Sequence, residues 1–285
     1  MTENFPSLIS TDWLADHLGE PDLEVLDASR HLPDAGRDAH AEYAAGHIPG
    51  ARFLDLASLT DTASPVPQAM PSPQQMSQRL TELGVSTDDR IVVYDDSAVK
   101  TAARAWFLLI AHGFKQVAIL DGGLAKWRSE GRATESGQPD IAPAEPIALG
   151  PPQRVRFKAD MLANLESRAE QVIDARSADR VFGSGIDPVH GGQNGRIPGS
   201  RNLPFGKLFN EDGTYISDPA QLRRILEDAG IDLAKPFVTT CGSGVTASVV
   251  LFAAHLAALD QTALYDGSWV DWSADPDTPK EQGPA

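Results

Sequence analysis

Short runs of apolar and β-branched residues alternate along this chain with longer segments whose apolar residues recur at helical spacing. In the first half the pattern predicts strands at residues 23–27, 90–94 and 117–120, and helices at residues 13–18, 41–45, 74–83 and 101–112. Strands that alternate with helices form a mostly parallel sheet, because each crossover connection places a helix against one face of it. The pattern therefore predicts an α/β fold with helices on both faces of the sheet.

The second half of the chain repeats the first. Val172–Arg176 repeats the pattern of Val25–Ser29, and Gly195–Ser200 repeats that of Gly46–Ala51. A repeat on this scale indicates a duplicated structural unit. Residues 130–152 are rich in proline and glycine and lack sustained periodicity, which is typical of a linker. We therefore expect two tandem α/β domains, residues 1–140 and residues 141–285.

Cys241, the only cysteine, stands between a predicted buried strand at 237–240 and a predicted buried helix at 246–259. A glycine-containing turn into a helix directs backbone N–H groups at one spot, with the positive end of the helix dipole behind them. Such a turn stabilises an anion, so we expect Cys241 to act as a thiolate nucleophile. A lone buried cysteine is more often inert, but an inert cysteine does not need an anion-binding turn.

The sequence Cys-Gly-Ser-Gly-Val-Thr at 241–246 resembles the active-site loop of the two-domain rhodanese-like sulfurtransferases, in the form typical of the 3-mercaptopyruvate branch. The thiosulfate branch usually carries arginine and lysine where this chain has Gly242 and Ser243. The resemblance implies two tandem rhodanese-like domains. It also implies that Cys241 accepts a sulfane sulfur as a persulfide, within a substrate-binding loop formed by Gly242, Ser243, Gly244, Val245 and Thr246.

The duplication places Asp95 of the first half where Cys241 stands in the second. A carboxylate cannot carry a sulfur atom as a persulfide. We therefore expect the first domain to be non-catalytic and the second to be catalytic, an asymmetry that the resembled family also has.

Sulfur donors of this family are anions, since mercaptopyruvate has a carboxylate and thiosulfate has two negative charges. Such donors need a cationic and preferably bidentate partner. Arg180 matches the family's substrate-binding arginine in spacing and flanking residues, although an ion pair with Asp179 or another neighbour is the alternative. Mercaptopyruvate enzymes usually carry a second arginine a few residues later, and residues 183–190 contain none. Arg196 is the candidate replacement within the substrate site, and Arg201 is another.

A second departure concerns the loop around Ser64 and Pro65. The mercaptopyruvate branch has an aspartate and a histidine that act with the loop serine, and the alignment places Ala57 and Gln68 at these positions. The donor therefore stays open between 3-mercaptopyruvate and thiosulfate. The expected acceptors are cyanide or a thiol, including a thioredoxin-like protein.

Composition and charge indicate the kind of partner and the cellular compartment. A formal net charge of −16 argues against nucleic acid or an anionic membrane as the main partner. The single cysteine and the absence of a secretory signal or long apolar run predict a cytoplasmic protein. The chemistry requires neither a metal nor an organic cofactor. Two alternatives are a cysteine phosphatase-like enzyme, although Thr246–Ser248 lacks the phosphate-binding arginine, and a non-catalytic rhodanese-like binding module.

Overall fold

A computed structural model describes residues 5–283 and divides the chain into two units. Unit 1 comprises the chain up to Asp61, Met70–Gln153 and Asp212–Tyr215. Unit 2 comprises Thr62–Ala69, Arg154–Glu211 and the chain from Ile216 onward. Within the described residues, each unit contains one five-stranded sheet, in which every neighbouring pair of strands is parallel.

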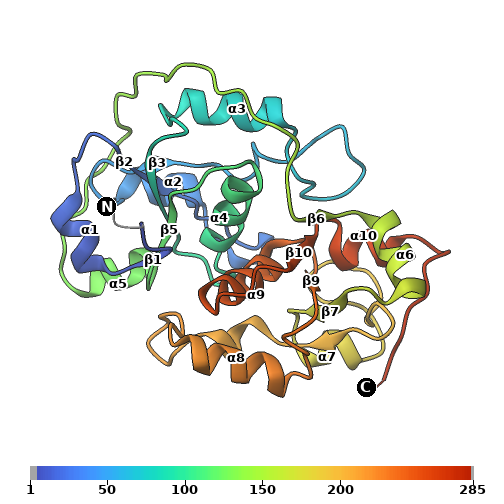
Figure 1. Cartoon of the computed structure of the whole chain (residues 1–285). Helices are drawn as coiled ribbons and strands as arrows, with labels where there is room; N and C mark the ends of the chain where they lie inside the picture. The colour runs from blue at the N-terminus through green and yellow to red at the C-terminus, as the bar shows by residue number, and fades with distance from the viewer. Residues whose placement is uncertain (1–4, 284–285) are drawn as a thin grey trace. The chain divides into compact units, whose positions relative to one another are not determined.

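The sheet of unit 1 has the strand order β1-β5-β4-β2-β3. Strands and helices alternate along the chain, as Figure 1 shows. The elements of unit 1 are β1 (Leu8–Ile9), α1 (Thr11–His17), β2 (Leu23–Asp27), the 3-10 helix η1 (Pro33–Ala35), α2 (Ala39–Ala45), β3 (Arg52–Phe53), α3 (Pro73–Glu82), β4 (Arg90–Tyr94), α4 (Ala102–Ala111), β5 (Val117–Leu120) and α5 (Gly123–Ser129).

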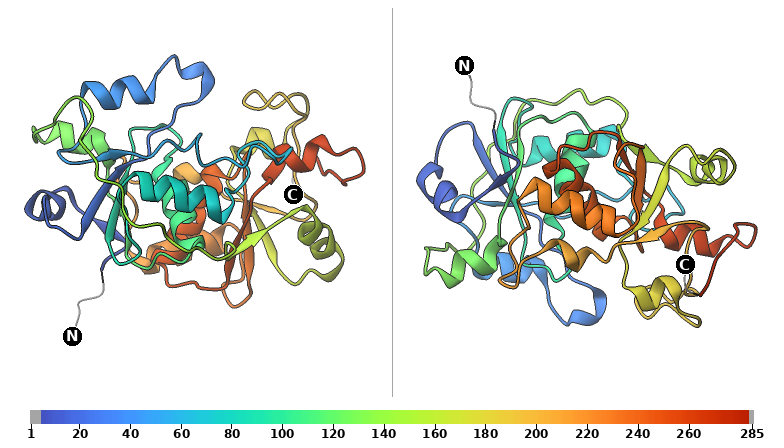
Figure 2. Two further views of the ribbon diagram at one scale, coloured as in Figure 1. Left: turned by 90° about the horizontal axis from the view of Figure 1, so that it is seen from above. Right: turned by 60° about the horizontal axis from the view of Figure 1, so that its bottom comes forward.

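The sheet of unit 2 has the order β6-β10-β9-β7-β8, which is the order of unit 1 with each strand replaced by its counterpart. Its elements are β6 (Val155–Arg156), α6 (Lys158–Ser167), β7 (Gln171–Asp174), α7 (Ala178–Phe182), β8 (Arg201–Asn202), the 3-10 helix η2 (Phe205–Leu208), α8 (Pro219–Asp228), β9 (Phe237–Thr240), α9 (Val245–Leu256), β10 (Thr262–Tyr265) and α10 (Ser268–Ala274). The predicted duplication is thus present in the topology, and the helices of each unit can be followed around its sheet in Figure 2.

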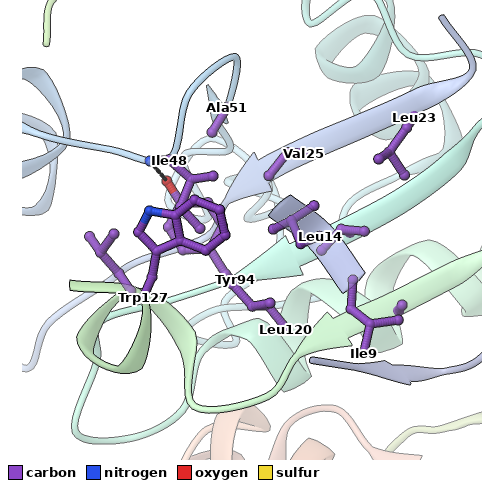
Figure 3. Packing of buried hydrophobic residues seen from close by; sticks show 12 residues of the cluster. Ile9, Leu14, Leu23, Val25, Ile48, Ala51, Tyr94, Leu120 and Trp127 are labelled. Atoms are coloured by element: carbon purple, nitrogen blue, oxygen red, sulfur yellow. Dashed lines mark hydrogen bonds between the residues drawn. The ribbon is translucent and has the colours of Figure 1, made fainter. Parts of the chain in front are cut away.

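The central strands β4 and β5 of unit 1 are buried on both faces, because Ile91–Tyr94 and Val117–Leu120 are apolar at successive positions. On β4, Val92 and Tyr94 pack with Leu14 of α1 and Trp127 of α5 in one core cluster. Figure 3 shows this cluster, with the Tyr94 hydroxyl accepting a hydrogen bond from the Ile48 N–H at 3.3 Å. The alternate residues of β4 are equally buried under helices of the opposite face, among them α4. Continuous apolar strands of this kind are typical of parallel sheets covered on both sides.

The predicted strands of the first half coincide with β2, β4 and β5, whereas several helix boundaries differ by a few residues. Helix α1 begins at Thr11 because Ser10 is its N-cap and accepts a hydrogen bond from the Trp13 N–H. Helix α9 ends at Leu256, before the predicted end at residue 259, because Ala258 has a left-handed φ of 55°. Local capping therefore decides these ends.

The chain passes from unit 1 to unit 2 at Gln153, later than the expected boundary after residue 140. Residues between these points bond to unit 1. The Ala144 N–H donates to the Thr81 carbonyl at 2.9 Å, and the Gln153 N–H donates to the Ala111 carbonyl at 2.8 Å. The proline-rich segment lacks helices and strands after residue 135, but its backbone groups are tied to α3 and to the end of α4.

Candidate active site

Cys241 is the first residue after β9, which lies in the middle of the unit 2 sheet between β7 and β10. The residue is 2% exposed, and its N–H donates to the Ser268 hydroxyl at 3.2 Å. Gly244 ends the turn with a φ of 79°, a left-handed conformation that favours glycine, and α9 begins at Val245. The cysteine therefore lies at the carboxyl edge of the sheet, directly before the N-terminus of a buried helix.

The start of α10 fixes the backbone of the cysteine loop. The Trp269 N–H donates to the Cys241 carbonyl at 3.0 Å, and the Val270 N–H donates to the Gly242 carbonyl at 2.9 Å. In a trans peptide the C=O and the following N–H point in opposite directions. The N–H groups of Gly242 and Ser243 therefore point away from the α10 N–H groups that bind the two carbonyls, and the first-turn N–H groups of α9 lack intrahelical acceptors. We expect these donors to stabilise a negative charge at the cysteine.

The other residues of the loop belong to the same strand–turn–helix unit. Gly242 and Ser243 are buried like the cysteine, whereas Val245 and Thr246 in the first turn of α9 are partly exposed. Ser248 donates its hydroxyl proton to the Gly244 carbonyl at 2.9 Å and so ties the turn to the helix. The structure thus brings together every sequence-predicted residue from 241 to 246.

Arg180 lies on the short helix α7 and is held by the carboxylate of Asp187. Its Nε and Nη2 donate to Asp187 Oδ2 at 3.1 and 2.7 Å, and the Asp187 side chain is fully buried. Burial favours a higher pKa for Asp187, but the hydrogen bonds from Arg180 and from the Val189 N–H outweigh burial and lower it. The neighbour that pairs with Arg180 is therefore Asp187, and not the Asp179 considered from the sequence.

His190 connects Arg180 to the cysteine loop. Arg180 Nη2 lies 3.0 Å from His190 Nδ1, and the imidazole packs against Gly242. A Cβ added at Gly242 would lie 2.2 Å from His190 Cε1, so a side chain at this position would displace the ring. Burial, together with the positive charge of Arg180, lowers the pKa of His190. The sequence pattern did not reveal this residue; the signal it offers is the polar pair Asp187 and His190 in a glycine-rich loop after Arg180.

Arg176 serves the fold at the end of β7. Its buried guanidinium donates to both carboxylate oxygens of Asp174 and to the Gly195 carbonyl. The same group lies over the Trp269 ring, with its Cζ 4.7 Å from the ring centroid. These contacts position α10, whose N-terminus in turn fixes the cysteine loop.

Arg196 takes part in a clamp that both units contain. Its Nη2 pairs with Glu281, and the other carboxylate oxygen of Glu281 accepts the Gly199 N–H at 2.9 Å. In unit 1 the matching residues are His47 and Glu135, which pair at 3.3 Å, and each pair is also an isolated antiparallel bridge. Because unit 1 has this clamp without a cysteine, we regard it as part of the fold. Among the described residues, the side chain contacts of Arg196 are with Glu281, Gly283 and Phe182 and include neither Arg180 nor His190.

Three other positions considered from the sequence can also be located. Arg201 is exposed on the edge strand β8, and a Cβ at Gly230 would lie 3.4 Å from its Nε. Ala57 is exposed and donates its N–H to Asp55 at 2.9 Å, and Gln68 has a left-handed φ of 60°. An alanine and a glutamine at these positions supply neither a carboxylate nor an imidazole to the loop serine.

Asp95 follows β4 in unit 1, at the position that Cys241 occupies after β9. Its Oδ1 accepts the Ser97 N–H at 2.9 Å and its Oδ2 accepts the Ala102 N–H at 2.6 Å. Its carbonyl accepts the Leu124 N–H, as the Cys241 carbonyl does from α10. Burial outweighs these hydrogen bonds and raises the pKa of Asp95 to about 6. The carboxylate oxygens of Asp95 therefore occupy the N–H donors that follow β4 in unit 1.

Within residues 5–283, no group of three or more histidine, cysteine, aspartate or glutamate side chains is arranged to hold a metal ion. None of the helices in this part of the chain is long and apolar enough to cross a membrane.

Comparison with known proteins identifies the domains. The rhodanese-like domain matches residues 10–130 and again residues 158–275. The chain is 39% identical over 274 residues to 3-mercaptopyruvate sulfurtransferase of Rattus norvegicus, covering 94% of this chain and 92% of that protein. It is 36% identical over 288 residues to thiosulfate sulfurtransferase of Cricetulus griseus, covering 98% and 96%.

A solved structure agrees with these sequence matches. The crystal structure of SseA from Escherichia coli, described as a 3-mercaptopyruvate sulfotransferase, has a TM-score of 0.83 and 36% identity, covering 92% of this chain and 98% of that one. The fold is therefore that of a tandem rhodanese-like protein. The chain belongs to the two-domain rhodanese-like sulfurtransferase family, and it is an enzyme of that class.

Proposed function

We propose that this enzyme takes a sulfane sulfur from an anionic donor, 3-mercaptopyruvate or thiosulfate, onto Cys241 as a persulfide and passes it to a thiophilic acceptor. The observation that carries the proposal is the position of Cys241 directly after β9 and just before the N-terminus of α9, in a loop whose carbonyls at 241 and 242 accept hydrogen bonds from the first turn of α10. That arrangement favours both a thiolate and the persulfide anion that replaces it.

The first half-reaction uses the thiolate as the nucleophile. The Cys241 thiolate attacks the outer sulfur of the donor and forms an S–S bond, while the bond from that sulfur to the rest of the donor breaks. Its electron pair leaves with pyruvate, as the enolate that then takes a proton, or with sulfite. Arg180, on α7, is the cation proposed to hold the donor anion, and Asp187 fixes its orientation.

The second half-reaction restores the cysteine. The acceptor attacks the terminal sulfur of the persulfide, the S–S bond breaks, and its electron pair returns to Cys241 as the thiolate. Cyanide, a small thiol or a reduced thioredoxin-like protein has the required nucleophile. Because the cycle needs a reduced cysteine, we propose that the enzyme works in a reducing compartment such as the cytoplasm.

Only the second of the two domains is proposed to be catalytic. Asp95 stands where a sulfur carrier would be needed in the first, and its oxygens accept the N–H groups of Ser97 in the loop and of Ala102 at the start of α4. Both donors stay within the proposal, since relatives of similar identity carry either name. The loop sequence 241–246 favours 3-mercaptopyruvate.

Replacement of the nucleophile tests the proposal. Cys241→Ser is expected to lower turnover at least about 1,000-fold with either donor, because an alcohol cannot carry the sulfur. Circular dichroism should show an unchanged fold, since serine is close to cysteine in size. Retained turnover in a folded Cys241→Ser protein would overturn the proposal.

A further inference from the structure

A cluster of three polar side chains lies against the cysteine loop and includes a residue with no assigned role. Asp187 is fully buried and holds Arg180, Arg180 contacts His190 at 3.0 Å, and the His190 ring packs on Gly242. The His190 side chain is 21% exposed, so a small molecule can reach it. The cluster therefore extends from α7 to the residue next to Cys241.

The contact with Arg180 determines which nitrogen of His190 carries the proton. A guanidinium can only donate hydrogen bonds, so Nδ1, at 3.0 Å from Arg180 Nη2, must be the acceptor. The neutral ring then carries its proton on Nε2. Burial and Arg180 lower the pKa of His190, which keeps this neutral form at neutral pH. His190 thus presents one uncharged N–H donor beside the cysteine loop.

The charges of the cluster are balanced. Asp187 Oδ2 lies 2.7 Å from Arg180 and 3.6 Å from Nη1 of Arg176, whose other partner is Asp174. Two arginines therefore face two carboxylates, and His190 adds a donor without adding charge. A sulfur donor with two negative charges therefore gains less electrostatic binding energy at this site than it would beside a second cation.

We propose that His190 is the second donor-binding group of the site, that its Nε2–H bonds to an oxygen of the sulfur donor, and that its neutrality sets the preference for singly over doubly charged donors. This inference rests on the proposed persulfide chemistry and assigns His190 the place left by the absent second arginine. Gly242 has no side chain because the imidazole occupies that space.

Substitutions that imitate one ring nitrogen at a time distinguish the contact of Nδ1 with Arg180 from the proposed contact of Nε2–H with the sulfur donor. In His190→Asn the amide oxygen can still accept from Arg180, but no donor reaches the Nε2 position. In His190→Gln the longer side chain places a neutral N–H near that position. We expect His190→Asn to raise KM for 3-mercaptopyruvate about 10-fold or more with kcat within about 3-fold, and His190→Gln to restore KM to within about 3-fold of the wild type.

A charged replacement tests the role of neutrality. His190→Arg is expected to raise kcat/KM for thiosulfate relative to that for 3-mercaptopyruvate at least about 10-fold, because a second cation favours the dianion. The matched control is His40→Ala in unit 1, where the histidine bonds to Gln138 at 3.0 Å, and it should change neither donor's kinetics.

Equal KM values for His190→Asn and the wild type, in folded proteins, would overturn the inference, as would an unchanged donor ratio in His190→Arg. Failure of the underlying chemistry has a different signature. If the wild-type protein forms no persulfide on Cys241, the proposed function fails; if it forms one and the His190 variants behave as the wild type, only the role of His190 fails.

Discussion

The two glycines that flank Ser243 are required for different physical reasons. Gly244 has a φ of 79°, which a residue with a Cβ adopts only with strain. Gly242 has no such backbone requirement, but a Cβ there would lie 2.2 Å from His190 Cε1 and 2.9 Å from its Nε2. The glycine-containing turn predicted from the sequence does not separate these two reasons, whereas the structure shows that the group close to Gly242 is a side chain of the protein itself.

Gly242→Ala is expected to displace His190 or the loop. Overpacking of this kind costs about 1–3 kcal/mol, and we expect kcat/KM to fall at least about 10-fold with either donor because the N–H groups move. The matched control is Gly206→Ala, since a Cβ at Gly206 meets nothing within 4 Å. Wild-type turnover in Gly242→Ala would show that His190 does not seat on the loop.

Asp95 makes the stability of unit 1 depend on pH. Its folded-state pKa of about 6 lies above the ordinary aspartate pKa of 3.8, so the folded protein binds the proton more tightly than the unfolded chain. The ionised carboxylate therefore lowers the free energy of unfolding, and this effect grows as pH rises from about 4 through about 6, to on the order of 2–3 kcal/mol.

Asp95→Asn removes this titration, so its stability should vary less with pH than that of the wild type. Hydrogen exchange of amides in residues 90–111, measured at pH 4.5 and pH 7.5, gives the difference in local stability between the two proteins at each pH. Effects of other titrating groups are the same in both proteins and cancel in this difference. Identical pH profiles would contradict the assignment of the raised pKa to Asp95.

At the level of elements, the strands are easier to predict than the helix ends. Strands β2, β4, β5 and β9 have apolar or β-branched runs bounded by polar or turn residues, so the sequence marks their limits. The pattern does not single out helices α5, α6, α7, α8 or α10; α7, for example, has five residues, which is too short to show a period. Helix α8 does carry a start signal, with Asp218 as N-cap and Pro219 at its first position.

The clamp formed by Arg196 and Glu281 fastens the end of the chain to the turn at 196–199. Arg196 also donates to the Gly283 carbonyl, and its Cζ lies 4.8 Å from the Phe182 ring centroid. The sequence motif singled out Arg196 for its position, but its partner lies about 85 residues away and could not be inferred from spacing.

We expect Arg196→Ala to lower the free energy of unfolding by about 1–3 kcal/mol, because it removes buried contacts while Glu281 can return to water. KM for either donor should stay within about 2-fold in the folded variant. Thermal melts and steady-state kinetics measure both, with Arg201→Ala as the exposed control. A raised KM without loss of stability would instead place Arg196 in the donor site.

At the level of the whole molecule, the duplication carries most of what the sequence could predict. Two sheets with the same strand order follow from two sets of matching motifs, and the contrast between Asp95 and Cys241 follows from their alignment. The boundary between the two units could not be predicted from the sequence, because backbone hydrogen bonds hold residues up to Gln153 in unit 1. The contact of His190 with the cysteine loop could not be predicted either, because it depends on the conformation of residues 183–195.

The central claim is that Cys241 carries the sulfur, and intact-protein mass spectrometry after brief exposure to each donor tests it directly. The account predicts a gain of one sulfur atom in the wild type with at least one of 3-mercaptopyruvate and thiosulfate, no gain in Cys241→Ser, and loss of the added sulfur when cyanide is supplied. Turnover in the wild type without any gain of sulfur, or an equal gain in Cys241→Ser, would contradict it.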